Sequence, residues 1–234
     1  MNLVLLHPDD FVAESRVRLT GRRLEHVANV HRAAIGDSLT VGLENGRIGR
    51  GAIARLDDAL ELDVTLDQEP PEKLPLTLVL ALPRPKVLNR VLAGATSLGV
   101  SRIILFNAWR VEKSYWKSPR LQDENLRRQR ILGLEQARDT VLPQLELRRF
   151  FRPFVEEELP AIANSTRKLV AHPKTAAECP RNVSEAVTLV VGPEGGFIDQ
   201  EIASLEQIGF EPVSLGPRIL RVETAVAAVI ARLF

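Results

Sequence analysis

Two loops in the C-terminal third of the chain combine glycine, proline and charged residues in a way that suits a small-molecule site. The first, Gly192 to Gly196, reads GPEGG, and the second runs from Leu215 to Ala225. Glycine lets the backbone adopt unusual φ angles and approach a ligand closely, and proline stiffens the turn. Each loop follows an apolar segment and precedes a helical pattern, so both are expected at strand-to-helix junctions.

The first loop, taken alone, has more than one explanation. Its N–H groups could bind a phosphate, but the Gly-Lys-Ser/Thr of a P-loop and the Gly-x-Gly-x-x-Gly of a dinucleotide site are absent. Glu194 would also repel a phosphate group. A tight turn without any ligand explains these glycines equally well.

The second loop adds Arg218, Arg221 and Glu223 beside a helix that is apolar nearly all round and is therefore expected to be buried. Charged groups at the mouth of a buried helix are unfavourable unless they are paired or functional. An Arg–Glu structural pair could account for one of the arginines. The two loops together indicate one ligand site.

The segments that would position these loops alternate between strands and helices after residue 75. Apolar strands are expected at 76–82, 102–106, 145–150, 168–171, 187–191 and 211–215. Helices are expected at 86–98, 123–138, 155–163, 199–208 and 223–234. This alternation predicts an α/β fold, with a parallel sheet covered on both faces and ligands at the carboxyl ends of its strands.

The first part of the chain has a different pattern. Short strands are expected at 2–6, 11–19, 38–43, 48–56 and 60–66, with a helix at 22–30. Asn45-Gly46 predicts a hairpin turn in which both residues have a positive φ. We predict a small β-barrel at 1–68, a stiff proline-rich linker at 69–75 and an α/β domain at 76–234.

Composition argues against several other classes of protein. The 234 residues carry a net charge of +1, and the single cysteine, Cys179, allows neither an intrachain disulfide nor a thiolate metal cluster. The four histidines are scattered, so no metal site is expected. No apolar run suits a bilayer span and the N-terminal residues do not resemble a signal peptide, so a cytoplasmic location is expected.

The GPEGG loop followed by LGxRILRxETA at 215–225 resembles the SPOUT superfamily and, within it, the 16S ribosomal RNA uridine-N3 methyltransferases. The resemblance spans the chain, with weaker motifs at 26–37, 95–100 and 135–136. It implies a C-terminal domain with a trefoil knot, a PUA-like N-terminal barrel and a homodimer. It also implies methylation of N3 of a uridine in 16S ribosomal RNA, within the small ribosomal subunit, with S-adenosyl-L-methionine (SAM) as cofactor.

The resemblance places the cofactor at the ends of three strands. The residues expected to hold SAM are Ala171, His172, Pro173, Val191, Gly192, Pro193, Glu194, Gly195, Gly196, Leu215, Gly216, Ile219, Leu220, Glu223, Thr224 and Ala225.

The reaction itself narrows the catalytic candidates. N3 of uracil carries a proton and is a poor nucleophile until that proton leaves, so a base or a cation that stabilises the uracil anion is required. We predict Arg221 and Arg138 as anion stabilisers and Glu135 as base or substrate orienter. Many relatives read Glu-Gln-x-Gly-Arg where residues 135–139 read EQARD, so Arg138 is shifted by one position from the family pattern.

RNA contacts are expected from two groups of basic residues that would mainly hold phosphates. One group lies on the barrel: Arg16, Arg18, Arg22, Arg23, His26 and Arg32. The other lies near the catalytic mouth: Arg84, Lys86, Arg110 and Lys113. Tyr115 and Trp116 could stack on bases, or could equally pack beneath a loop.

Two alternative functions remain open from the sequence. A relative that kept the fold without catalysis would be an RNA-binding ribosome assembly factor. A related enzyme could methylate another RNA or a ribose 2′-hydroxyl.

Overall fold

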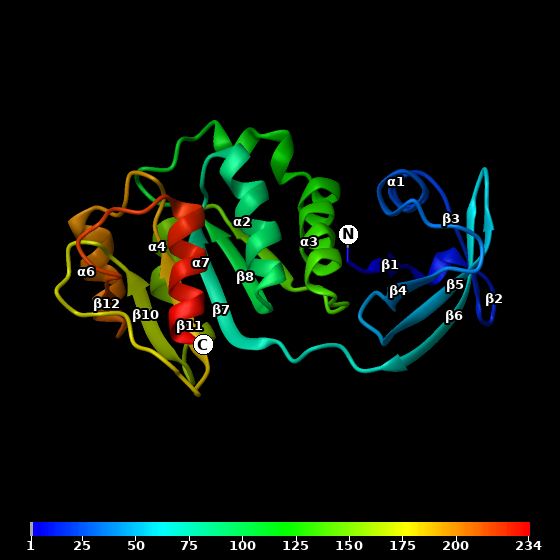
Figure 1. Ribbon diagram of the computed structural model, residues 1–234. Helices are drawn as coiled ribbons and strands as arrows, with labels where there is room; N and C mark the ends of the chain where they lie inside the picture. The colour runs from blue at the N-terminus through cyan, green and yellow to red at the C-terminus, as the bar shows by residue number, and fades with distance from the viewer. Residues whose placement is uncertain (1) are drawn as a thin grey trace. The chain divides into compact units, whose positions relative to one another are not determined.

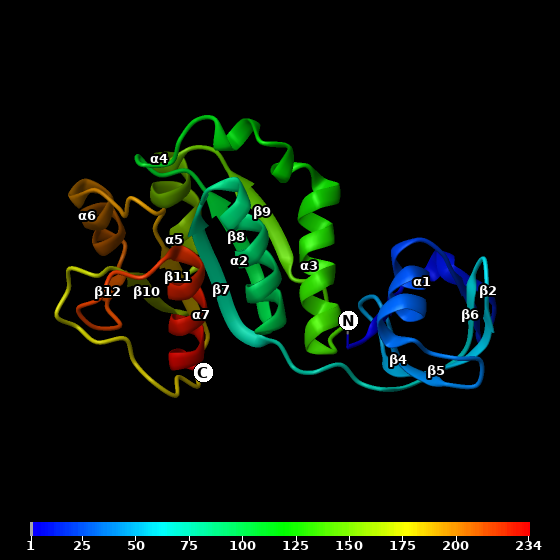
Figure 2. The same ribbon diagram turned by 45° about the horizontal axis from the view of Figure 1, so that its top comes forward.

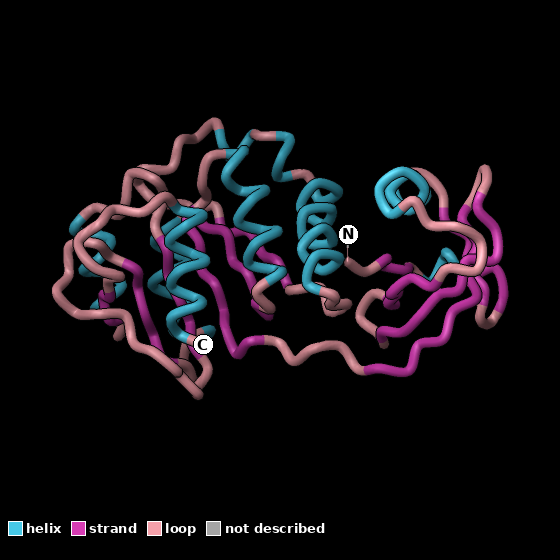
Figure 3. Tube along the Cα trace, viewed as in Figure 1, coloured by secondary structure: helices cyan, strands magenta, loops and turns pink. Residues whose placement is uncertain are grey.

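The computed structural model describes residues 2–234, which divide into two compact units (Figures 1 and 3). The first unit comprises the chain up to Glu72 together with 130–142, and the second comprises 73–129 and 143–234. The segment 130–142 includes the last turns of helix α3 (Asp123–Ala137), so one helix contributes to both units. None of the described helices has the length and apolarity needed to cross a membrane.

The first unit is built on a six-stranded mixed sheet with the strand order β1-β4-β5-β6-β3-β2. The strands are β1 (Val4–Leu6), β2 (Phe11–Ala13), β3 (Arg16–Leu19), β4 (Ser38–Leu43), β5 (Ile48–Leu56) and β6 (Leu60–Gln68). Helix α1 (Arg22–His26) and the π-helical turn η2 (Val27–His31) lie between β3 and β4, and the short helix η1 (Pro8–Asp10) precedes β2. Alternate residues of these strands form the core, among them Val17, Leu19, Val41, Leu60 and Leu62.

The hairpin predicted at Asn45-Gly46 joins β4 to β5 as expected, but one detail of the prediction is wrong. Asn45 has φ +56°, whereas Gly46 is not among the residues with positive φ. The Asn45 side-chain oxygen instead accepts a hydrogen bond from the Leu142 N–H at 2.9 Å, so contacts within the first unit help to shape the turn.

The second unit contains a six-stranded sheet in which every strand is parallel to its neighbours, with the order β12-β10-β11-β7-β8-β9. Its strands are β7 (Leu74–Ala81), β8 (Val100–Phe106), β9 (Gln144–Arg148), β10 (Arg167–Ala171), β11 (Val187–Val191) and β12 (Glu211–Val213). Strands covered on both faces read as continuous apolar runs, which is why their positions were predictable. The predicted α/β fold with a parallel sheet is confirmed.

Helices cover both faces of this sheet. Helices α2 (Pro85–Ser97) and α7 (Val222–Leu233) lie side by side on one face (Figures 1 and 2). The other helical segments are η3 (Tyr115–Lys117), η4 (Pro119–Leu121), α4 (Phe151–Pro153), η5 (Phe154–Glu158), α5 (Leu159–Ile162) and α6 (Asp199–Gln207). Phe106 of β8 packs against Phe154 of η5 at a ring-centroid distance of 5.5 Å.

A buried ion pair stabilises the first unit. The Glu135 side chain is only 2% exposed, and both of its carboxylate oxygens accept hydrogen bonds from Arg22 at 2.8 Å. The hydrogen bonds that Arg22 donates to Glu135 raise the pKa of the Arg22 guanidinium. A buried carboxylate without this partner would be desolvated and unpaired.

We expect Arg22→Ala to lower the free energy of unfolding by about 2 kcal/mol. This loss is smaller than that for a fully buried ion pair, because Arg22 is partly exposed and water can reach the site. Urea unfolding measures this value. Arg18→Ala is the matched control, because Arg18 faces Asp58 at 3.8 Å on the surface and should cost less than about 1 kcal/mol. Equal stability of the two variants would contradict the assigned role of the pair.

Candidate functional site

Three strands of the second unit end level with one another at the carboxyl edge of the sheet. The register pairs Ala171, the last residue of β10, with Val191 of β11 on one side and with Val213 of β12 on the other. The three loops that follow therefore start at the same height. This is the edge at which parallel α/β sheets bind ligands.

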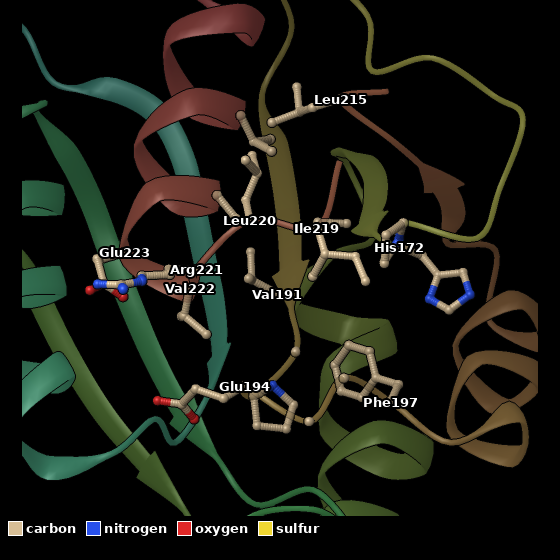
Figure 4. A pocket seen from close by; sticks show the side chains of 18 of the residues that line it. His172, Val191, Glu194, Phe197, Leu215, Ile219, Leu220, Arg221, Val222 and Glu223 are labelled. Carbon is tan, nitrogen blue, oxygen red and sulfur yellow. The ribbon is translucent and has the colours of Figure 1, made fainter. Parts of the chain in front are cut away.

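These three loops line a pocket of about 740 Å³, together with residues from α2 and α7 (Figure 4). Cavities of this size commonly hold cofactors and other small molecules. The residues predicted to hold the cofactor line this pocket, with the exception of Thr224: Ala171, His172, Pro173, Val191, Gly192, Pro193, Glu194, Gly195, Gly196, Leu215, Gly216, Ile219, Leu220, Glu223 and Ala225.

The glycine-rich loop passes close to buried aromatic side chains. A Cβ added to Gly192 would lie 3.1 Å and 3.2 Å from two ring carbons of Phe197. Phe197 is itself buried and packs against Phe106 at a ring-centroid distance of 6.3 Å, so it has little room to retreat. Gly196 has φ +70°, a conformation that side chains rarely adopt. These glycines are required by the shape of the loop.

Apolar side chains and exposed backbone make up much of the pocket wall. Figure 4 shows Val191, Leu215, Ile219 and Leu220 grouped around the pocket, with Phe197 at its lower end in that view. Ile219 is 85% exposed, so its side chain is free to contact a ligand. Apolar walls with nearby backbone N–H and C=O groups suit a flat heterocycle such as adenine.

The rim of the pocket is cationic. Its charged lining residues are Arg84, Arg90, Arg110, Lys174, Arg218, Arg221, Glu194 and Glu223. The two acids are already engaged, since Glu194 accepts a hydrogen bond from the Arg84 backbone N–H at 3.0 Å and Glu223 lies 3.3 Å from Arg90. Excess positive charge at the rim favours an anionic partner.

His172 lines the pocket in an environment that favours its neutral form. Burial, reinforced by the nearby Lys174, lowers the pKa of its imidazole below the ordinary value. Among the described residues, no cluster of histidine, cysteine or carboxylate side chains could hold a metal ion.

Comparison with known proteins shows the family to which the chain belongs. A family model described as an RNA methyltransferase domain matches residues 70–234. The ribosomal RNA small subunit methyltransferase E of Treponema pallidum is 30% identical over 99% of this chain and 90% of its own length. The chain belongs to this methyltransferase family.

Solved structures agree with this assignment. A ribosomal RNA small subunit methyltransferase E from Neisseria gonorrhoeae, bound to SAM, matches with a TM-score of 0.76 and 26% identity, covering 99% of this chain and 95% of that one. A putative methyltransferase from Legionella pneumophila, in complex with SAM, matches with a TM-score of 0.76 and 25% identity, covering 98% and 95%.

The three predicted catalytic residues of this methyltransferase do not all belong to the pocket. Arg221 lines it, immediately before helix α7. Glu135 and Arg138 belong to the first unit and are not among the lining residues. The Glu135 carboxylate is occupied by Arg22, and Arg138 has φ +55° just after α3 ends. The geometry therefore supports Arg221 alone as a residue of the pocket.

The predicted RNA-binding residues fall into paired and accessible groups. Arg84 and Arg110 line the pocket, and Lys86 and Lys113 are exposed. On the first unit, Arg16 makes two hydrogen bonds of 2.9 Å to Asp63, Arg22 pairs with Glu135, and Arg23 pairs with Asp10 at 2.6 Å. Arg18 and Arg32 are exposed, and His26 is half-buried. The two residues of each ion pair lie far apart in the sequence, so these pairs could not be predicted from local sequence patterns.

The two aromatic residues that could stack on bases are both half-buried. The Trp116 ring N–H donates to Asn107 Oδ1 at 2.8 Å, and the Tyr115 hydroxyl donates to Glu112 at 3.1 Å. Burial raises the pKa of the Tyr115 hydroxyl above its ordinary value. Both side chains pack against the core of the second unit, in agreement with packing beneath a loop.

Sequence reasoning missed several residues of the site. Phe197, Arg90 and Lys174 line the pocket, and Glu201 lies buried behind the glycine-rich loop. The Glu201 carboxylate accepts hydrogen bonds from the Trp109 N–H at 2.7 Å and the Ile198 N–H at 3.0 Å. A glutamate at the third position of a helix is a known capping signal and could have indicated this role.

Proposed function

We propose that this chain is a SAM-dependent methyltransferase that methylates N3 of a specific uridine in 16S ribosomal RNA. The observation that carries the proposal is the pocket at three level strand ends, with its apolar walls and cationic rim. SAM-bound relatives that match over nearly the whole chain support the choice of cofactor. The names of the curated relatives support small-subunit ribosomal RNA as substrate.

The residues of the pocket fit SAM. The close approach of Gly192 to Phe197 keeps side chains out of the glycine-rich loop, so its backbone can border a ligand. Val191, Leu215 and Leu220 offer apolar contacts for adenine. When bound, SAM supplies a methyl group on a sulfonium sulfur. A nucleophile would attack the methyl carbon in line with its bond to that sulfur.

Arg221 would act on the uracil. As the N3 proton leaves, negative charge spreads over N3 and the flanking carbonyl oxygens, and a guanidinium stabilises that charge. The N3–H bond breaks, a bond from N3 to the methyl carbon forms, and the carbon–sulfur bond breaks. The products are N3-methyluridine, S-adenosylhomocysteine and a proton.

The remaining parts of the proposal concern architecture and partners. We propose that the first unit is a PUA-like barrel that binds RNA through residues such as Arg18 and Arg32, with domains at 1–68 and 76–234 and a linker at 69–75. The curved mixed sheet and the exposed arginines support this role. We further propose a trefoil knot in the second unit, a homodimer and a cytoplasmic location, all supported by the family resemblance.

Mass spectrometry of small-subunit ribosomal RNA tests the function. A strain lacking the gene should lose one N3-methyluridine, and a plasmid copy should restore it. Loss of a ribose methyl with unchanged base methylation would favour the ribose 2′-hydroxyl alternative. Unchanged methylation, together with no SAM binding by the purified chain, would favour a non-catalytic assembly factor.

A further inference from the structure

Two large aromatic side chains lie exposed on the second unit. Trp109 is 78% exposed and Phe150 is 71% exposed. Trp109 follows β8 and Phe150 follows β9, and these parallel strands are neighbours whose ends pair Phe106 with Arg148 (Figure 2). Both residues therefore follow the carboxyl edge of the same sheet. Exposed aromatic groups of this size commonly mark a binding surface.

Two hydrogen bonds and a cation–π contact connect the segments that carry these two residues. The Asn107 N–H donates to the Arg148 carbonyl oxygen at 3.0 Å, and Asn107 Oδ1 accepts from the Trp116 ring N–H. The Arg149 guanidinium lies over the Trp116 ring, 5.9 Å from its centroid. We name the set of Trp109, Trp116, Arg149 and Phe150 the aromatic surface.

The backbone beneath Trp109 is held firmly. Its N–H donates to the buried carboxylate of Glu201 at 2.7 Å, and the same carboxylate accepts from the Ile198 N–H. The exposure of the indole is therefore a feature of an anchored segment. Because the backbone is already anchored, the segment loses little backbone entropy when a partner stacks on the indole.

The aromatic surface continues into the cofactor pocket through Arg110. This residue follows Trp109, lines the pocket and donates a hydrogen bond to the Gly195 carbonyl oxygen at 2.5 Å. In the described part of the chain, neither Arg110 nor Arg149 has a carboxylate partner. The occupant should therefore carry negative charge as well as flat apolar rings.

Single-stranded RNA has both properties. Unpaired bases stack on aromatic faces and on arginine guanidinium planes, while their phosphates meet cations. A second copy of the chain could cover the rings, but with a net charge of +1 it offers no overall negative charge to the two arginines. The charge of the surface therefore favours RNA.

We propose that the aromatic surface stacks unpaired bases that flank the target nucleotide, with Trp109 as the first platform beyond the pocket. This inference rests on the proposed RNA methyltransferase function and names how its substrate is held. It assigns stacking to Trp109 and Phe150, whereas the half-buried Trp116 supports Arg149.

The test compares Trp109→Leu with Trp109→Phe. Both variants keep the backbone N–H that Glu201 accepts, and both keep an apolar side chain, but only phenylalanine keeps an aromatic face. Binding of an unstructured oligouridine and methylation of small-subunit RNA are measured for both variants, with SAM affinity and molar mass as controls. Leu98→Val, at an exposed apolar residue of the second unit just before β8 begins, is the surface control.

We expect Trp109→Leu to weaken oligouridine binding and raise the KM for RNA about tenfold, with SAM affinity unchanged, and Trp109→Phe to recover most of the loss. Oligouridine should also quench the fluorescence of Trp109, a signal absent from Trp109→Phe. Equal RNA affinity of the leucine and wild-type proteins, or a change of molar mass in the leucine variant, would overturn the inference.

The two proposals can fail separately. If the wild-type protein methylates RNA and the leucine variant does so equally well, the stacking inference fails and the proposed function stands. If oligouridine quenches Trp109 but no RNA is methylated, the aromatic surface stands and the proposed function fails.

Discussion

Replacing Arg221 with alanine is expected to lower the kcat of methyl transfer by about 100- to 1000-fold. Arg221 is the one predicted catalytic residue that lines the pocket, and it lies next to the first turn of α7. If its guanidinium stabilises the uracil anion, the variant loses a charge contact that strengthens as N3 is deprotonated. The loss of a comparable donor to a developing anion costs about this much in other enzymes.

The pH dependence separates this role from simple RNA binding. In the variant, the uracil anion would form without a cation beside it, so the N3 proton would leave at a higher pH. The methylation rate of the variant should therefore keep rising at alkaline pH after the wild-type rate has levelled. Single-turnover methylation of small-subunit RNA with radiolabelled SAM measures both rates. A proportional loss at every pH would indicate that Arg221 only positions the substrate.

Arg218→Ala is the matched control for Arg221→Ala. It removes a guanidinium from the same loop and the same pocket rim. Both arginines are exposed, but Arg218 lies three residues further from helix α7, so its loss should mainly weaken RNA binding and reduce the salt dependence of that binding. If Arg218→Ala lowered kcat as much as Arg221→Ala, the assignment of Arg221 would lose its support.

The sequence was sufficient to predict the parallel sheet of the second unit and most of the residues that line its pocket. Strands such as Val187–Val191 are buried on both faces and read as unbroken apolar runs, so local composition reveals them. Because parallel strands end at one edge, loops that are distant in sequence could be assigned to one site. Thr224 is the exception, since successive residues of a helix point in directions about 100° apart and Thr224 does not share the pocket side of Glu223 and Ala225.

The parts that sequence reasoning missed depend on contacts between distant segments. In the sequence, Glu135 belongs to a single long helix, and periodicity cannot show that the last turns of α3 belong with the first unit. The basic cluster at Arg16, Arg22 and Arg23 similarly reads as an RNA-binding face. All three arginines have acidic partners elsewhere in the chain, and no local pattern indicates which ones.

Gly192→Val is expected to raise the dissociation constant for SAM by about 10- to 100-fold. Even the first carbon of the new side chain would lie within 3.1 Å to 3.2 Å of the Phe197 ring. Phe197 is buried against Phe106, so the loop rather than the ring must move. Overpacking of this kind typically costs about 1–3 kcal/mol, and here the displaced loop is itself the proposed SAM-binding segment.

Gly195→Ala provides the comparison that makes this prediction specific. A Cβ at Gly195 would meet the exposed Arg110 side chain, with its Cδ at 3.0 Å and its Cβ at 3.2 Å, but alanine adds one carbon where valine adds three. Isothermal titration calorimetry should therefore show a smaller loss of SAM affinity for Gly195→Ala than for Gly192→Val. Thermal unfolding checks that both variants are folded. Wild-type affinity in a folded Gly192→Val protein would show that SAM does not depend on the position of this loop.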